Sequence, residues 1–355
     1  MGRLGGDEFA IVLPGKGQSS RDMEIAEAVL ERLRDPVEIE GSPIQLTASI
    51  GLAAIVGAES ATDEVLRNAD LAMYAAKSAG GDRIRRFSAD LADRAVVASR
   101  LRNELAAAIR GGGFDLDYQS IVDLHNNSVV GAEALVRLRR GTVRVPAGAF
   151  VTLAEQTGQI VGIGRIVLDT LAVDIARLRP VMPPGWFVTV NVSAKELADP
   201  DIITRLVDGP LAACAQSIHL EVTEGLELAS QDDTMSTLRA LRDGGYRIAI
   251  DDFGTGYSNF ERLGELRPDL FKIDRSLVVG ARTMTGSGNA LLAAAVGVAR
   301  TLRCRVLAEG VETFADHRVV TDLPIDFGQG FHYSRPAPLS SLLAGPGAGD
   351  PTTAT

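Results

Sequence analysis

Acidic and amide side chains recur along the second part of the chain, each at the end of a short apolar run typical of a β-strand. The set comprises Glu133, Asn191, Glu221, Asp251, Asp252 and Glu309, and Lys272 stands inside a further apolar run. In one partly dehydrated pocket, five carboxylates and one ammonium would carry a formal charge of −4, and their repulsion would require bound cations. Oxygen ligands without His or Cys favour Mg²⁺ or Mn²⁺, and two such ions would balance the charge.

The strands that would carry these residues follow from the apolar runs beyond Gly113. We predict eight of them, at 114–124, 129–138, 186–192, 218–223, 247–252, 270–274, 305–310 and 327–331. Helical patterns separate them at 150–155, 160–178, 202–214, 233–242, 289–302 and 313–323. Eight strands alternating with helices close into a (β/α)8 TIM-like barrel, an α/β fold whose active sites lie where the carboxyl ends of the strands converge.

One connection predicts an irregularity in this barrel. Only residues 125–128 join the first two strands, whereas a parallel crossover needs a dozen or more. These two strands must therefore form a hairpin, and we predict a barrel with an antiparallel first strand.

The length of 355 residues predicts two domains. Residues 1–87 mix short β-like runs, at 9–13 and 44–54, with helical patterns at 21–33 and 63–78, which indicates an α+β segment. A polar stretch at 88–113 ends in three glycines and is interpreted as a helical connector. We expect the barrel over 114–342 and a disordered tail at 343–355.

Composition and charge exclude several classes of protein. No apolar run approaches the roughly 20 residues of a bilayer span, and the first residues lack the pattern of a secretion signal. We therefore expect a cytoplasmic chain, associated with a membrane only through an upstream segment of a longer protein. The net charge of −10 argues against a DNA-binding surface, but not against an anionic ligand held through metal ions.

An ordered set of motifs, one at each predicted strand end, resembles the EAL-domain cyclic-di-GMP phosphodiesterases. Glu133-Ala134-Leu135-Val136-Arg137 is similar to the signature of that family, and further matching motifs begin at Tyr118, Asn191, Glu221, Asp251, Lys272, Glu309 and Gln329. The resemblance covers residues 101–339. It implies a barrel with a reversed first strand and hydrolysis of cyclic di-GMP to linear pGpG by two-metal-ion catalysis.

The same resemblance implies roles for the site residues. One divalent cation would be held by Glu133, Asn191, Glu221 and Asp251, and the second by Asp251, Asp252 and Glu309. Lys272, Glu309 and Glu133 would be catalytic, and Lys272 would orient the attacking water or neutralise developing charge. The residues implied as nucleotide contacts are Gln119, Arg137 and Gln329.

The resemblance also concerns a loop and a partner. In the family, the loop that corresponds to residues 252–259 gates metal binding and dimer contacts. Glu224 and Glu312 would support this loop and the metal ligands. A homodimer through the barrel is therefore expected. The chain departs from the family pattern at Ser120, Leu138 and Arg165, where Pro, Trp and Trp are usual. None of the three is an expected metal ligand, so these differences affect packing and the fit of guanine rather than the chemistry.

Near the amino terminus, Gly5-Gly6-Asp7-Glu8-Phe9 resembles the GGDEF signature of diguanylate cyclases, and the likeness continues to residue 87. In that family the preceding half-domain supplies the central strand, a metal-binding aspartate and the guanine-reading residue. Half a pocket cannot position two triphosphates, so we expect a remnant that is inactive as a cyclase. Either residues 1–87 are loosely held, which strong hydrogen-exchange protection across 44–52 would contradict, or the chain is a fragment of a longer protein with an upstream sensor.

Two other functions compete with hydrolysis of cyclic di-GMP. A non-catalytic cyclic-di-GMP receptor would signal through the connector, but such barrels have typically lost several metal ligands, and none is lost here. A barrel enzyme that cleaves sugars through two carboxylates would leave Asn191, the Asp251-Asp252 pair and Lys272 without a purpose.

Overall fold

The structure is a computed structural model, and it describes residues 1–13, 20–39, 42–55, 61–223, 232–254, 264–283 and 287–343. The chain divides into two compact units, Met1–Asn103 and Glu104–Thr355. The boundary falls inside one helix, α3 (Ala89–Gly111), in the region expected to be a helical connector. Most of the tail expected at 343–355 lies outside the described residues. None of the described helices is long and apolar enough to cross a membrane.

The first unit contains short strands that pair two by two. Its elements before α3 are β1 (Gly2–Gly5), β2 (Glu8–Ala10), α1 (Ser20–Leu33), β3 (Val37–Ile39), β4 (Ser42–Ile44), β5 (Ser49–Leu52), α2 (Thr62–Ser78) and β6 (Arg83–Arg86). The β1–β2 and β3–β4 pairs are antiparallel, and β5 pairs with β6 in parallel. The single run predicted at 44–54 is therefore wrong, because β4 turns back on β3 whereas β5 pairs with β6.

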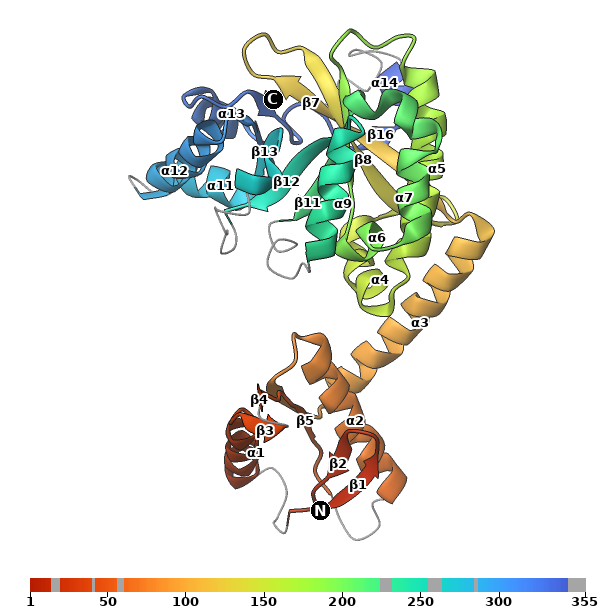
Figure 1. Ribbon diagram of the computed structural model, residues 1–355, viewed down its shortest axis with the longest axis vertical. Coiled ribbons are helices and arrows are strands. Elements are labelled where there is room, and N and C mark those ends of the chain that lie inside the picture. The colour runs from red at the N-terminus through yellow and green to blue at the C-terminus, as the bar shows by residue number, and fades with distance from the viewer. Residues whose placement is uncertain are drawn as a thin grey trace. The chain divides into compact units, whose positions relative to one another are not determined.

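The second unit is built around a closed eight-stranded barrel (Figure 1). Its strands are β7 (Phe114–Asp123), β8 (Val129–Arg140), β10 (Phe187–Asn191), β11 (Ile218–Thr223), β12 (Arg247–Phe253), β13 (Leu270–Ile273), β14 (Arg305–Ala308) and β15 (Phe327–Gly328). Strand β7 is antiparallel to both of its neighbours, β8 and β15, and the other neighbouring pairs in the ring are parallel. This confirms the barrel with an antiparallel first strand.

Two short strands extend the ring, namely β9 (Val143–Pro146) beside β8 and β16 (Ala337–Pro338) beside β7. The helices that cover it are η1 (Ala147–Ala149), α4 (Val151–Thr157), α5 (Ile160–Leu178), α6 (Ala194–Leu197), α7 (Pro200–Val207), η2 (Pro210–Ser217), α9 (Asp232–Asp243), α11 (Arg275–Thr283), α12 (Ser287–Thr301), α13 (Phe314–Thr321) and α14 (Leu339–Leu343). The helix predicted at 202–214 is broken at Gly209, which is extended, because Pro210 starts a new 3-10 helix.

Side chains that face into the barrel form an apolar layer below a polar one. Ile121, Phe187, Ala249, Leu270, Leu307 and Phe327 pack together as a buried cluster. Because strand side chains alternate between faces, the inward residue two positions nearer the open end is polar on each of these strands, and on the antiparallel β7 it precedes the apolar residue. These polar positions are Gln119, Thr189, Asp251, Lys272, Glu309 and Gln329. The apolar layer thus forms the floor of the polar one.

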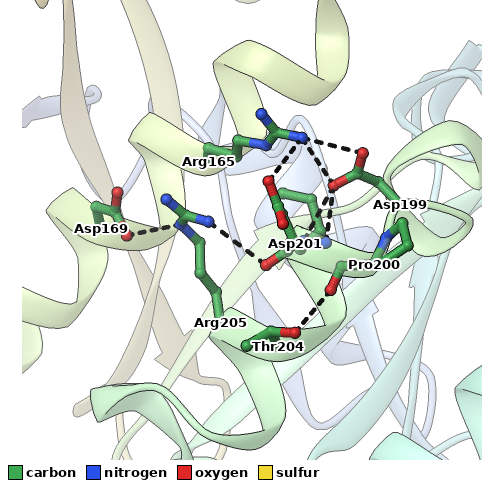
Figure 2. A network of polar contacts seen from close by, with 8 residues as sticks. Arg165, Asp169, Asp199, Pro200, Asp201, Thr204 and Arg205 are labelled. Carbon is green, nitrogen blue, oxygen red and sulfur yellow. Dashed lines mark hydrogen bonds and ion pairs between the residues drawn. The ribbon is translucent and has the colours of Figure 1, made fainter.

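Charged side chains join α5 to α7 on the outside of the barrel (Figure 2). Arg165, one of the positions that depart from the family pattern, contacts Asp199 and Asp201 at 3.1 Å each. Arg205 of α7 forms a further ion pair between these two helices, with Asp169 of α5 at 3.0 Å. Leu138, a second such position, is fully buried in β8. Both residues therefore serve packing between elements.

Candidate active site

Lys272 lies at the centre of the polar layer and is surrounded by carboxylates. Its Nζ atom is 2.7 Å from Glu309 Oε1, 2.8 Å from Glu221 Oε1, 3.2 Å from Asp251 Oδ1 and 3.6 Å from Glu133 Oε1. The side chain of Lys272 is 1% exposed and that of Glu221 is fully buried. Four strands, β8, β11, β12 and β13, and the residue after β14 thus bring five charged groups to one point.

Burial lowers the pKa of Lys272 and raises the pKa values of Glu221 and Glu309, and the charges around each group add to these shifts or oppose them. Burial alone would lower the pKa of Lys272, but Glu133, Glu221, Glu309 and Asp251 together raise it well above its usual value. Burial raises the pKa of Glu221 well above normal, and the nearby Glu133 adds to that effect. Burial likewise raises the pKa of Glu309 to about 8, although Lys272 opposes the shift. The lysine is therefore charged, and the cluster holds more carboxylates than it can neutralise.

Amide side chains tie the carboxylates to one another. The Nδ2 atom of Asn191, the last residue of β10, donates to Glu133 Oε1 at 3.1 Å and to Glu221 Oε2 at 2.8 Å. Gln329 Nε2 donates to Glu133 Oε2 at 2.6 Å and to Gln119 Oε1 at 3.1 Å. Glu133 is thus held from both sides, and Gln119 in turn donates to the Ser334 carbonyl at 2.9 Å.

Asp251 and Asp252 both reach the cluster because β12 is irregular there. Ligand oxygens of Asp251, Asp252 and Glu309 all lie within 4.8 Å of one another. Consecutive strand residues normally face opposite sides, but the pairing of β12 with β13 shifts register between Ile250 and Phe253, and Asp252 has a φ of 55°. This left-handed backbone is costly for most residues and is tolerated best by Gly, Asn and Asp.

A cavity of about 250 Å³ opens onto the cluster. Its lining includes Glu133, Asp251, Lys272 and Glu309, together with Gln119, Leu135, Arg275, Gly310, Glu312, Gln329, Gly330 and Phe331. Arg275 and Phe331 are not among the site residues expected from the sequence. Phe331 belongs to the matching motif Gln329-Gly330-Phe331, and Arg275 directly follows the motif Lys272-Ile273-Asp274, so both positions could have been indicated. Phe331 is 47% exposed, and the Arg275 guanidinium pairs with Glu312 at 2.7 Å.

Arg137, expected to contact the nucleotide, does not line this cavity. Its Nε atom pairs with Asp117 Oδ2 at 2.8 Å, and both side chains are 9% exposed. Its Nη1 atom donates to the Val136 carbonyl at 3.1 Å. Asp117 also contacts Arg144 at 3.0 Å. These contacts of Arg137 therefore tie β7 and β8 together beside the site.

The remaining predicted residues fall in three places. Glu312 lines the cavity, whereas Glu224 and most of the loop at 252–259 lie outside the described residues. Gly5, Gly6, Asp7, Glu8 and Phe9 lie on and between β1 and β2 of the first unit. Phe9 is 60% exposed there, so this hairpin buries little of its apolar surface.

The donor set fits hard divalent cations. Every candidate ligand of the cluster is a carboxylate or an amide, and the nearest cation, Lys272, offsets one charge among five carboxylates. Divalent ions are the means by which such a pocket is ordinarily neutralised without protonating its acids.

Comparison with known families assigns both units. The profile described as EAL domain matches residues 102–336, and the profile described as diguanylate cyclase, GGDEF domain, matches residues 1–83.

Curated relatives extend this similarity across nearly the whole chain. The bifunctional diguanylate cyclase/cyclic di-GMP phosphodiesterase MucR of Pseudomonas aeruginosa is 33% identical over 345 residues, 96% of this chain and 50% of that protein. The cyclic di-GMP phosphodiesterase NbdA of the same species is 32% identical over 96% of this chain and 44% of that protein. The chain thus spans about half the length of these relatives.

A solved structure matches the barrel. The structure of the Pseudomonas aeruginosa MucR phosphodiesterase in complex with cyclic di-GMP superposes with a TM-score of 0.63 at 33% identity. The match covers 68% of this chain and 99% of that one. The barrel therefore has the fold of a domain whose known structure contains a bound cyclic dinucleotide.

Proposed function

This chain belongs to the EAL-domain family, and from that premise we propose that its barrel hydrolyses one phosphodiester bond of cyclic di-GMP to give linear pGpG. The observation that carries the proposal is the contact of Lys272 with four carboxylates at the open end of the barrel. The similarity to cyclic-di-GMP phosphodiesterases supports the choice of substrate.

The cluster offers two overlapping sets of ligands for divalent cations. Glu133, Asn191, Glu221 and Asp251 would hold the first ion, and Asp251, Asp252 and Glu309 the second. The chemistry that such a pair supplies when bound is a lowered pKa of a water molecule and stabilised charge on the attacking and leaving oxygens. Asn191 would have to present its amide oxygen instead of the nitrogen that now donates to the carboxylates.

The protein's own groups would position the reactants. Lys272 is a fixed, fully buried ammonium, so it can hold a water or a phosphoryl oxygen without first losing solvent. Glu309 lies 2.7 Å from it, and in its ionised form it could accept the proton of the attacking water while the P–O bond breaks and the leaving oxygen takes up a proton from solvent. Gln329 and Gln119 fix the orientation of Glu133.

The direct test is incubation of the protein with cyclic di-GMP and Mg²⁺, followed by chromatography for pGpG. We expect product from the natural sequence and a rate lowered by more than about 100-fold in Glu133→Ala. Undiminished product from that variant would remove Glu133 from the mechanism.

A second candidate is a receptor that binds cyclic di-GMP without cleaving it. The proposed ligand residues present in the cluster disfavour it, because a receptor does not need a metal-binding set. Calorimetry measures binding of cyclic di-GMP in Mg²⁺, and chromatography of the same sample measures pGpG. Binding without any pGpG would favour the receptor.

The first unit would not act as a cyclase in this chain. Its Gly5–Phe9 hairpin pairs with no third strand in the described part of the chain. Incubation with GTP and Mg²⁺ should yield no cyclic di-GMP, and appearance of that product would contradict this.

A homodimer through the barrel remains a prediction that the mass in solution would test.

A further inference from the structure

A buried carboxylate outside the cluster holds the chain segment that follows Asn191. Strand β10 ends at Asn191, and α6 begins three residues later with Ser193 as its N-cap. Glu196 Oε2 accepts hydrogen bonds from Ser193 N at 2.7 Å and from Ser193 Oγ at 2.5 Å, while Glu196 N donates to Ser193 Oγ at 3.4 Å. This reciprocal pair is a capping box, which fixes the backbone just beyond the end of the strand.

The burial of Glu196 distinguishes it from an ordinary helix cap. The residue is only 6% exposed, although α6 has a single turn. Its other oxygen, Oε1, lies against Gly164 of α5, where an added Cβ atom would stand 2.0 Å from that oxygen. The absence of a side chain at Gly164 therefore provides the space that the carboxylate occupies.

The turn held in this way lies between α5 and the acid cluster. Val192 N donates to the Glu221 carbonyl at 2.9 Å, so the chain leaving β10 is fixed to β11 directly before Ser193. Asn191 is itself 2.8 Å from Glu221 and 3.1 Å from Glu133. Contacts therefore run from Gly164 through Glu196 to Ser193, and the backbone of Val192, fixed to β11, joins Ser193 to Asn191.

We propose that Glu196 is a positioning residue for Asn191, and that it sets the affinity of the cluster for divalent cations. The inference rests on the proposed function, because it takes Asn191 as a metal ligand. Residues that orient metal ligands typically change metal affinity by about 10- to 100-fold when they are removed. Without Glu196, the turn at Ser193 loses two hydrogen bonds, and the Asn191 amide is no longer fixed relative to Glu133 and Glu221.

Binding of Mn²⁺ alone, followed by electron paramagnetic resonance without nucleotide, tests the proposal. Glu196→Ala should bind Mn²⁺ about 10- to 100-fold more weakly than the natural sequence. Glu196→Gln, which keeps the shape and an acceptor oxygen, should restore most of the affinity. Gly164→Ala should weaken binding although Glu196 is unchanged, because the new methyl group occupies the place of the carboxylate.

Two controls separate positioning from simple stabilisation. Asp199→Ala removes the N-cap of the neighbouring helix α7 (Figure 2) and should lower the melting temperature without changing Mn²⁺ affinity. In an Asn191→Ala background, Glu196→Ala should have no further effect on Mn²⁺ binding, since it acts through the missing amide.

The outcomes also separate this inference from the proposed function. A natural sequence that binds no Mn²⁺ would overturn the metal site itself and this inference with it. If the natural sequence binds Mn²⁺ and Gly164→Ala and Glu196→Ala bind it equally well, only the positioning role fails. An additive loss in the double variant would likewise show that Glu196 does not act through Asn191.

Discussion

The Nζ atom of Lys272 lies 2.7 Å from Oε1 of Glu309, and both groups come from neighbouring parallel strands that end at the same face of the barrel. Lys272 is 1% exposed although it lines the cavity, and the side chain of Glu309 is 20% exposed. The pair thus joins the interior of the barrel to the cavity. This arrangement makes the lysine a structural counter-charge as well as a candidate catalytic group.

Replacing Lys272 should therefore affect both stability and turnover. In Lys272→Ala, Glu221 stays buried without its cation, and the free energy of unfolding without divalent ions should fall by about 3–5 kcal/mol. Added Mg²⁺ should restore more stability to this variant than to the natural sequence, as thermal unfolding would measure. Turnover of cyclic di-GMP should fall by at least about 100-fold. The control Arg239→Ala breaks the exposed pair with Glu265 and should cost less than about 1 kcal/mol.

The backbone at Asp252 allows its carboxylate to be tested apart from the fold. Asp252→Gly relieves a positive φ and should leave stability unchanged or raise it by up to about 1 kcal/mol. The same change removes one acid of the cluster, so hydrolysis should fall by more than about 100-fold. Asn127→Gly relieves a φ of 57° in the β7–β8 turn and should leave hydrolysis unaltered. Full activity in Asp252→Gly would exclude that carboxylate from metal binding.

Glu196 should make stability depend on pH. Burial raises its pKa to about 7, the hydrogen bonds from Ser193 oppose the shift, and Glu155 adds to it. A carboxyl whose pKa is higher when folded binds more protons in the folded than in the unfolded state, so stability falls as pH rises from about 4.5 to about 7. The loss is on the order of 3 kcal/mol. Denaturant unfolding at pH 5 and pH 7.5 measures the change in the free energy of unfolding with pH. We expect a smaller change in Glu196→Gln than in the natural sequence. An equal change in both proteins would show that Glu196 is not its cause.

The pair of Arg137 and Asp117 allows the proposed nucleotide contact to be separated from packing. Arg137→Ala breaks the buried contact and should lower the free energy of unfolding by about 2–3 kcal/mol, less than for an isolated pair because Asp117 keeps its contact with Arg144. Asp117→Ala removes the carboxylate from both arginines and should lower the free energy of unfolding by about 3–5 kcal/mol. If Arg137 contacts the nucleotide, only Arg137→Ala raises KM for cyclic di-GMP. Equal KM values in the two variants would assign Arg137 to packing alone.

The barrel and its reversed strand could be predicted from the sequence because the signals are local. Apolar runs mark strands, and the short connection at 125–128 permits only an antiparallel pair. Five of the six acidic and amide positions could also be found, because each lies at or near the end of such a run and parallel strands end at one face. Glu133 lies inside β8 and was indicated by its resemblance to the family signature. The break at Gly209 and the division between β4 and β5 were not predicted, because apolar patterning alone does not register a change of strand partner or a short interruption.

The sequence by itself thus determined which strands carry the candidate site residues, because apolar runs mark the strands and alternation separates inward from outward positions wherever a strand is regular. Only the tertiary structure decided their distances and partners. Lys272 contacts four carboxylates, Arg137 pairs with Asp117, and Glu196 fits against Gly164. These contacts join residues far apart in the chain, and they depend on barrel closure, on a local register shift in β12 and on helix packing, none of which is encoded within a single segment.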